Sequence, residues 1–275
     1  MDSISFDFSD RTDLDYLRPP LVAVEAMTRE LGVEFLIVGA AARDLLLRFG
    51  HEFPAGRATE DLDIAVAVAD WETYHRVRSG FEHRRGDPVH RLRIGGMLVD
   101  LVPFGGVERP DRTIAWPPDD GSVMSAFGMA EALPHAVPVR VGPALLCKVA
   151  SLPAQMVLKL TAWDERGAVK PRHDSTDIKL LLTAYSGTWN IDRLYEHTDL
   201  LEAYDFDVRL AGAALLGRDT ARLLGLRGVQ RLGPLVARTV GETGWLPEDM
   251  PGDGDENEAL LVAYRRGMAP DQDGK

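Results

Sequence analysis

The chain contains very little cysteine and has no long apolar segment. Cys147 is the single cysteine among 275 residues, which excludes an intrachain disulfide and a zinc site built from several thiolates. The longest apolar runs are too short and too often interrupted to cross a bilayer. The acidic first 20 residues lack the basic and then apolar form of a signal peptide. We therefore expect a protein of the reducing cytoplasm that makes no contact with a membrane.

An excess of positive charge is also missing. The formal net charge is −12, which argues against a broad, sequence-blind surface for nucleic acid. The charge is still compatible with a local basic patch, because residues 75–96 hold the arginines Arg76, Arg78, Arg84, Arg85, Arg91 and Arg93. Contact with RNA through this Arg76–Arg93 region and a merely solvated charged face are the two interpretations of the cluster.

Secondary-structure patterns divide the chain into two halves and a tail. Up to about residue 140, helical stretches alternate with short strands such as "VEFLIVGA" and "DLDIAVAV", and Gly95-Gly96 marks a hairpin turn. From Pro143 onward the apolar period is helical. We predict an α+β fold. Its parts are an α/β domain over 1–142 with an irregular lead-in over 1–20, a helical domain over 143–246, and an acidic, largely flexible tail over 247–275.

Two aspartates interrupt an apolar strand pattern in "DLDIAVAV". Residues i and i+2 of a strand point to the same face, so Asp61 and Asp63 project side by side. Two parallel carboxylates repel each other unless a cation lies between them, and Mg²⁺ prefers such oxygen ligands where phosphates complete its shell. Asp100 interrupts a second apolar strand, "LVDLVPF". If the two strands are neighbours, three carboxylates converge on one or two metal ions.

The alternative interpretation of these carboxylates is structural. In that case Asp61 caps a loop, Asp63 pairs with an arginine, and Asp100 faces solvent on an edge strand.

The segments "FLIVGAAARDLLL", "ATEDLDIAV" and "MLVDLVPF" together resemble the polymerase-β superfamily of nucleotidyltransferases. The resemblance implies a small mixed sheet flanked by helices. It also implies a glycine turn whose backbone N–H groups approach a phosphate at a helix N-terminus. "VGAAARDLLL" is similar to the corresponding turn of CCA-adding enzymes and assigns nucleotide binding to Gly39, Ala40 and Arg43. The chain departs from the pattern at Ala40, where a Gly or Ser is usual, and in a longer gap before Asp61.

The segment "MVLKLTAWDERGAVKPRHDSTDIKLLL" resembles AbiEii-type nucleotidyltransferases, which include the MenT toxins of toxin–antitoxin systems. The resemblance assigns nucleotide binding to Lys159, Asp174 and Thr59, and catalytic roles to Lys159 and Asp177. Simpler interpretations are a lysine on a helix surface, and Asp174 as the N-cap of a helix that begins near Ser175.

These patterns predict an enzyme that moves an NMP from an NTP to an acceptor hydroxyl and releases pyrophosphate, with Mg²⁺ or Mn²⁺ bound by Asp61, Asp63 and Asp100. The resemblance implies a toxin-type enzyme that acts on RNA such as tRNA, with a cognate antitoxin as partner. A second hypothesis replaces RNA by a small cationic acceptor, as in aminoglycoside nucleotidyltransferases. A third is a catalytically idle module of the same fold that binds nucleotide or a partner.

Overall fold

The computed structural model describes residues 5–54, 61–118, 120–166, 172–240 and 244–269. The chain divides into two compact units, Met1–Ser151 and Leu152–Lys275, and each is considered by itself. None of the helices in these ranges is both long and apolar enough to cross a membrane.

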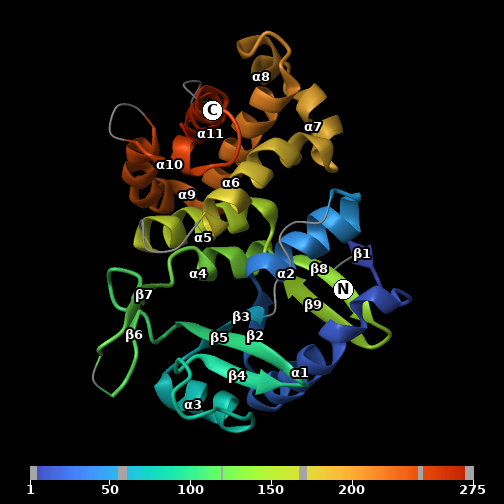
Figure 1. The fold of residues 1–275 in the computed structure, drawn as a ribbon, viewed down its shortest axis with the longest axis vertical. Coiled ribbons are helices and arrows are strands. Elements are labelled where there is room, and N and C mark those ends of the chain that lie inside the picture. The colour runs from blue at the N-terminus through green and yellow to red at the C-terminus, as the bar shows by residue number, and fades with distance from the viewer. Residues whose placement is uncertain (1–4, 55–60, 119, 167–171, 241–243, 270–275) are drawn as a thin grey trace. The chain divides into compact units, whose positions relative to one another are not determined.

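The first unit is built on a mixed sheet (Figure 1). Over the described residues its strand order is β1-β8-β9-β2-β3-β5-β4. β3 runs parallel to β5 and antiparallel to β2, and β4 is the antiparallel edge strand beside β5. The strands of this sheet are β1 (Phe6–Asp7), β2 (Glu34–Ile37), β3 (Asp61–Val68), β4 (Arg91–Ile94), β5 (Met97–Gly105), β8 (Val137–Gly142) and β9 (Leu145–Val149).

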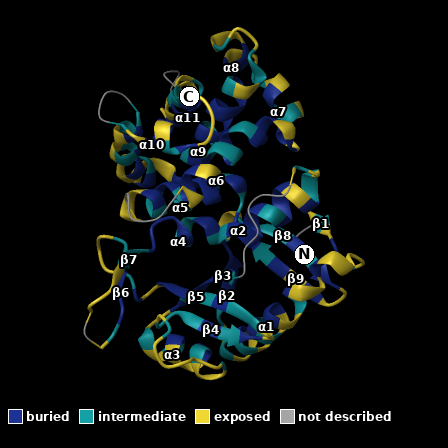
Figure 2. Cartoon of the chain, in the orientation of Figure 1, coloured by how far each residue is buried: buried dark blue, intermediate teal, exposed yellow. Residues whose placement is uncertain are grey.

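Helices pack against this sheet and fix its central strands. Tyr74 is fully buried, and its hydroxyl donates a hydrogen bond of 2.9 Å to the Leu101 carbonyl on β5. Figure 2 shows that buried residues gather along the central strands. The helices of the unit are α1 (Arg18–Leu31), α2 (Gly39–Arg43) with a π-helical turn (Asp44–Phe49), α3 (Trp71–Ser79) and α4 (Met129–Ala132), and a small hairpin joins β6 (Thr113–Ala115) to β7 (Val123–Ser125).

The second unit is helical throughout its described residues (Figure 1). Its longest helix, α9, is kinked at Gly225, which has φ 62°. α9 packs closely on α11, because Gly217 and Gly267 have no side chains to hold the two backbones apart. The helices are α5 (Leu152–Arg166), α6 (His173–Ala184), α7 (Asn190–Glu196), α8 (Thr198–Ala203), α9 (Val208–Thr239), α10 (Leu246–Asp249) and α11 (Gly254–Met268).

The predicted fold class, a mixed sheet flanked by helices and followed by a helical half, is confirmed. The hairpin at Gly95-Gly96 is also confirmed. Both glycines have positive φ, 58° and 86°, which is the left-handed conformation that a two-residue turn of this kind requires.

Two predicted boundaries are wrong. The helical half was expected to begin at 143, but residues Leu145–Val149 form β9, and the first unit ends at Ser151. β9 lies inside the sheet between β8 and β2, so its apolar residues alternate in burial with a strand's period. The tail over 247–275 was expected to be largely flexible, yet α11 packs on α9 and buries Leu260, Leu261 and Tyr264.

Candidate active site

Three carboxylates converge on neighbouring strands of the first unit. β3 and β5 pair in a parallel register that places Asp63 beside Asp100. Asp61 and Asp63 share one face of β3, where both are half-buried, while Leu62 and Ile64 on the other face are completely buried. The strand pattern therefore sends the two aspartates to one side, as predicted. The side chain of Asp100 is 13% exposed and mostly buried, whereas that of Asp61 is 33% exposed and partly reaches water.

The turn between β2 and α2 lies directly against these carboxylates. The backbone N–H of Val38 donates to the Asp63 carbonyl at 3.0 Å. Gly39 then opens α2 with φ 65°. A Cβ atom at Gly39 would overlap Oδ2 of Asp63 and lie 2.8 Å from its Cγ. Glycine is thus required here both by its φ and by the close approach of the Asp63 carboxylate.

Arg91 is a cation that binds two carboxylates of the cluster. Its Nε and Nη2 donate to Oδ1 and Oδ2 of Asp100, both at 2.7 Å, and Nη2 also donates to Oδ2 of Asp61 at 3.2 Å. The pKa of Arg91 is raised, chiefly by the hydrogen bonds to Asp100 and further by the charges of Asp100, Asp61 and Asp63. Arg91 therefore stays charged and holds the two strands' carboxylates together.

Sequence reasoning missed this role and placed Arg91 in the basic patch. The signal was available, because Gly95-Gly96 fixes the hairpin register and that register places Arg91 opposite Asp100. His90 also lies near the cluster, with Nε2 3.9 Å from Oδ2 of Asp100.

The three carboxylates fit a divalent cation in their donor chemistry, since Mg²⁺ and Mn²⁺ prefer carboxylate oxygens. Within the described ranges, however, no three His, Cys, Asp or Glu side chains are grouped as in a formed metal centre. The Arg91 guanidinium is hydrogen-bonded to both Asp61 and Asp100. Metal binding by Asp61, Asp63 and Asp100 therefore stays a prediction.

The other residues assigned to nucleotide binding in the first unit lie in the α2 region. Ala40 is buried, and its methyl group offers no hydrogen bond. Arg43 is 3% exposed, and its Nε donates to Oδ1 of Asp44 at 2.8 Å. Thr59 lies outside the described residues.

Lys159, Asp174 and Asp177 form a separate cluster in the second unit. Lys159 Nζ lies 3.1 Å from Oδ1 of Asp174 and 2.7 Å from Oδ2 of Asp177, and Arg166 Nη1 donates to Oδ2 of Asp174 at 2.8 Å. Burial opposes the charged lysine, but the two aspartates outweigh it, so the pKa of Lys159 is raised. The charge of Lys159 is thus already balanced within its own unit.

Both simpler interpretations of this cluster are wrong. Lys159 does not lie on a helix surface, because its side chain is only 17% exposed. The N-cap position of α6 belongs to Arg172, and Asp174 lies in the first turn, where its carboxylate binds Lys159 and Arg166.

The predicted basic patch does not form a single free cationic surface. Arg91 is held by the carboxylates, Arg78 donates to the Val89 carbonyl at 3.0 Å, and Arg84 pairs with Glu82 at 3.2 Å. Arg76 and Arg85 are exposed. Carboxylates therefore balance the charges of Arg84 and Arg91, while Arg78, whose partner is a neutral carbonyl, keeps its positive charge.

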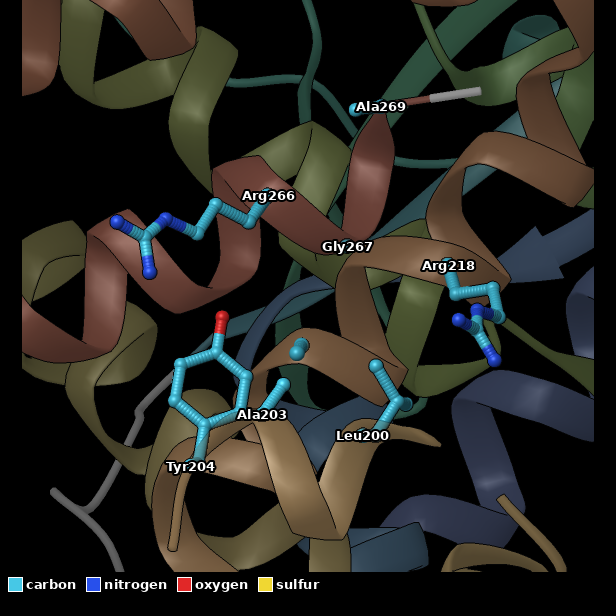
Figure 3. Close-up of a pocket in the computed structure, with 8 residues that line it drawn as sticks. Leu200, Ala203, Tyr204, Arg218, Arg266, Gly267 and Ala269 are labelled. Atoms are coloured by element: carbon cyan, nitrogen blue, oxygen red, sulfur yellow. The ribbon is translucent and has the colours of Figure 1, made fainter. Parts of the chain in front are cut away.

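A pocket of about 160 Å³ lies in the second unit near the end of α8. Figure 3 shows Tyr204 beside it and the guanidinium groups of Arg218 and Arg266 on opposite sides. Arg218 is bound to Asp199 at 2.6 Å. Because the two arginines do not converge, we assign no ligand to this pocket.

No protein-family model matches the chain, and no curated protein matches it either. Several solved structures are similar. The crystal structure of ANT(2'')-Ia in complex with adenylyl-2''-tobramycin covers 73% of this chain and 97% of its own, with 18% identity and a TM-score of 0.38. A solution structure of the antibiotic-resistance factor ANT(2'')-Ia covers 71% and 98%, with 18% identity and a TM-score of 0.39.

A crystal structure of an antigenic nucleotidyltransferase-like protein from Paracoccidioides brasiliensis is similar as well. It covers 70% of this chain and 92% of its own, with 18% identity and a TM-score of 0.40. At this identity and these TM-scores the similarity does not establish a shared activity.

Proposed function

We propose that the chain is a metal-dependent nucleotidyltransferase that moves an NMP from an NTP to an acceptor hydroxyl. The observation that carries this proposal is the convergence of Asp61, Asp63 and Asp100 on two adjacent parallel strands, beside the turn at Gly39. In the reaction the acceptor oxygen forms a bond to the α-phosphorus, and the bond from that phosphorus to the bridging oxygen breaks. Pyrophosphate leaves, and the hydroxyl proton passes to a carboxylate.

Each residue of the cluster has a role in this scheme. Asp61, Asp63 and Asp100 hold Mg²⁺ or Mn²⁺, and Asp100 also helps to take the proton of the acceptor hydroxyl. The bound metal supplies Lewis-acid stabilisation of the charge that develops on the phosphate oxygens. The turn at Gly39 offers backbone N–H groups to the triphosphate.

The family resemblance adds Arg43, Thr59, Lys159 and Asp174 to nucleotide binding, and it gives Lys159 and Asp177 catalytic roles. The ion pairs of Lys159 and Arg43 within their own units give these residues less free charge to offer. The proposal therefore rests on the carboxylates of the first unit.

Two acceptor classes are compatible with this chemistry. The resemblance to AbiEii-type enzymes favours RNA such as a tRNA end, and a cognate antitoxin belongs to that alternative. A small cationic molecule such as an aminoglycoside is favoured by the net charge of −12 and by the pairing of Arg84 and Arg91 with carboxylates. We favour the cationic acceptor, because an acidic site attracts it whereas RNA needs free positive charge.

The test uses purified protein, NTPs labelled at the α-phosphate, and Mg²⁺ or Mn²⁺. Total RNA and a panel of aminoglycosides are supplied in separate reactions. Transfer of the α-phosphate label to RNA or to an aminoglycoside identifies the acceptor class. NTP binding without any transfer would support the idle module and count against the enzyme.

Asp61→Asn and Asp63→Asn should each lower transfer at least about 100-fold, the scale of removing one group that stabilises transition-state charge. The matched control is Asp13→Asn, which alters another Asp-x-Asp pair of the same unit at an exposed position. Transfer that survives both β3 substitutions would refute the assignment.

A further inference from the structure

The carboxylate cluster contains its own cation. Arg91 forms a two-pronged ion pair with Asp100 and a third hydrogen bond to Asp61, at 2.7, 2.7 and 3.2 Å. These contacts join β4, β5 and β3 through one guanidinium. They relieve the repulsion between the carboxylates, which is the task that a metal ion would otherwise perform.

A metal ion and this guanidinium compete for the same oxygens. Both oxygens of Asp100 and Oδ2 of Asp61 already accept from Arg91. A divalent ion bound by the cluster needs direct bonds to such oxygens. Each carboxylate oxygen keeps a second lone pair, but the positive guanidinium repels a divalent ion at the same oxygens, so the Arg91 ion pair opposes the binding of a metal ion to Asp61 and Asp100 together.

The position of Arg91 allows this exchange. Arg91 is the first residue of β4, the edge strand of the sheet over its described residues, and its side chain is 30% exposed. A long side chain at such a place can turn toward water without disturbing the core. Lys159 in the second unit is different, because its side chain is 17% exposed and lies between two buried aspartates.

We propose that Arg91 is a resident counter-cation of the carboxylate cluster, and that divalent metal binds by exchange with its guanidinium. This inference rests on the proposed function in one respect, namely that Asp61, Asp63 and Asp100 hold the metal. Arg91 acts through these carboxylates and is a positioning residue. It stabilises the metal-free protein and lowers the apparent affinity for metal.

The test measures Mn²⁺ binding to the metal-free full chain by calorimetry and by electron paramagnetic resonance, without nucleotide. Arg91→Gln should bind Mn²⁺ at least about tenfold more tightly than the unaltered chain, because no guanidinium has to be displaced. The matched control, Arg76→Gln, removes the same charge from an exposed position of α3 and should leave the affinity unchanged within about twofold.

Thermal unfolding supplies a second readout. In EDTA, Arg91→Gln should have a lower melting temperature than the unaltered chain, because its carboxylates have lost their partner. Added Mn²⁺ should raise the melting temperature of Arg91→Gln by more than it raises that of the unaltered chain. If Arg91→Gln does not fold, Arg91→Lys replaces it. This variant keeps the charge but loses the two-pronged pair, and it should bind Mn²⁺ a few-fold more tightly.

The outcomes separate this inference from the proposed function. Unchanged Mn²⁺ affinity in the Arg91 variants, with NMP transfer in the unaltered chain, overturns the exchange and leaves the function standing. Tighter binding in Arg91→Gln without any NMP transfer supports the exchange and counts against the function. No Mn²⁺ binding by any of the proteins overturns the exchange, and the transfer assay alone then decides the proposed function.

Discussion

Replacing Gly39 by alanine tests how closely the β2–α2 turn depends on the Asp63 carboxylate. Two costs are expected. The first is the backbone, because φ 65° at Gly39 is a left-handed conformation, which costs an alanine about 1–2 kcal/mol. The second is the new methyl group, which would overlap Oδ2 of Asp63 and lie 2.8 Å from its Cγ and 3.0 Å from its Cβ.

Rotation of the Asp63 carboxylate cannot remove the second cost entirely. Rotation moves Oδ2, but Cβ of Asp63 is fixed to β3 and is itself closer to the new methyl group than ordinary van der Waals contact allows. Either the turn or β3 must shift. Overpacking of this kind costs about 1–3 kcal/mol, so we expect a total loss of about 2–5 kcal/mol for Gly39→Ala.

Gly32→Ala is the matched control for the backbone. Gly32 also has φ 65°, but nothing lies within 4 Å of the position its Cβ would take. This variant should lose only about 1–2 kcal/mol. Urea unfolding gives the free energy of unfolding of both variants, and the difference between their losses measures the cost of the contact with Asp63. A loss at Gly39→Ala no larger than at Gly32→Ala, with unchanged Mn²⁺ binding, would refute the account of the turn.

Three further predictions concern packing and buried ionisable groups. Gly217→Ala should cost about 1–3 kcal/mol in urea unfolding, because the new methyl group would overlap the Tyr264 carbonyl oxygen. Burial raises the pKa of Cys147 from 9.0 to about 12, so the thiol ionises first in the unfolded chain, and stability should fall by about 1.4 kcal/mol per pH unit between those values. Cys147→Ala should make this fall of stability with pH less steep by about that amount, and the buried Tyr74, Tyr185 and Tyr264, whose pKa values are also raised, account for the remainder. Equal slopes in the two proteins would contradict the prediction. Lys159→Met leaves two aspartates buried without their lysine, so it should cost about 3–5 kcal/mol at neutral pH and less in acid, where the carboxylates take up protons.

The elements that sequence reasoning predicted correctly are those with local causes. The alternation of residues in "DLDIAVAV" sends Asp61 and Asp63 to one face whatever the rest of the chain does. The Gly95-Gly96 turn needs only two adjacent residues with positive φ. Gly39 likewise predicts a turn between a strand and a helix, because glycine readily adopts the positive φ that this turn requires.

The elements that were missed depend on distant partners. β9 is a short apolar run whose period is ambiguous, and it becomes a strand because it pairs with β8 and meets β2, more than 100 residues earlier in the chain. The α11 segment looks like an acidic tail until α9 supplies a surface for Leu260, Leu261 and Tyr264. Asp253 caps this helix by accepting from the Glu256 N–H, a local signal that the high charge of the segment obscured.

The two charged clusters follow the same electrostatic rule but differ in what they can exchange. In each, buried or half-buried aspartates are paired with cations, which are Arg91 in the first unit and Lys159 with Arg166 in the second. Arg91 is on an edge strand and 30% exposed, while Lys159 is 17% exposed and bound from two sides. A ligand cation can therefore replace the guanidinium at a smaller cost than the lysine.

This difference predicts where divalent metal binds. Asp61→Asn should lower Mn²⁺ affinity at least about tenfold, because it removes a carboxylate of the exchangeable cluster. Asp177→Asn should lower stability, because it leaves Lys159 with a weaker partner, but it should leave Mn²⁺ affinity unchanged. Calorimetric titration of both variants with Mn²⁺ checks the pair. If Asp177→Asn weakened Mn²⁺ binding as much as Asp61→Asn, aspartates of both clusters would contribute to Mn²⁺ affinity. Exchange with Arg91 could then not be the only process that determines this affinity.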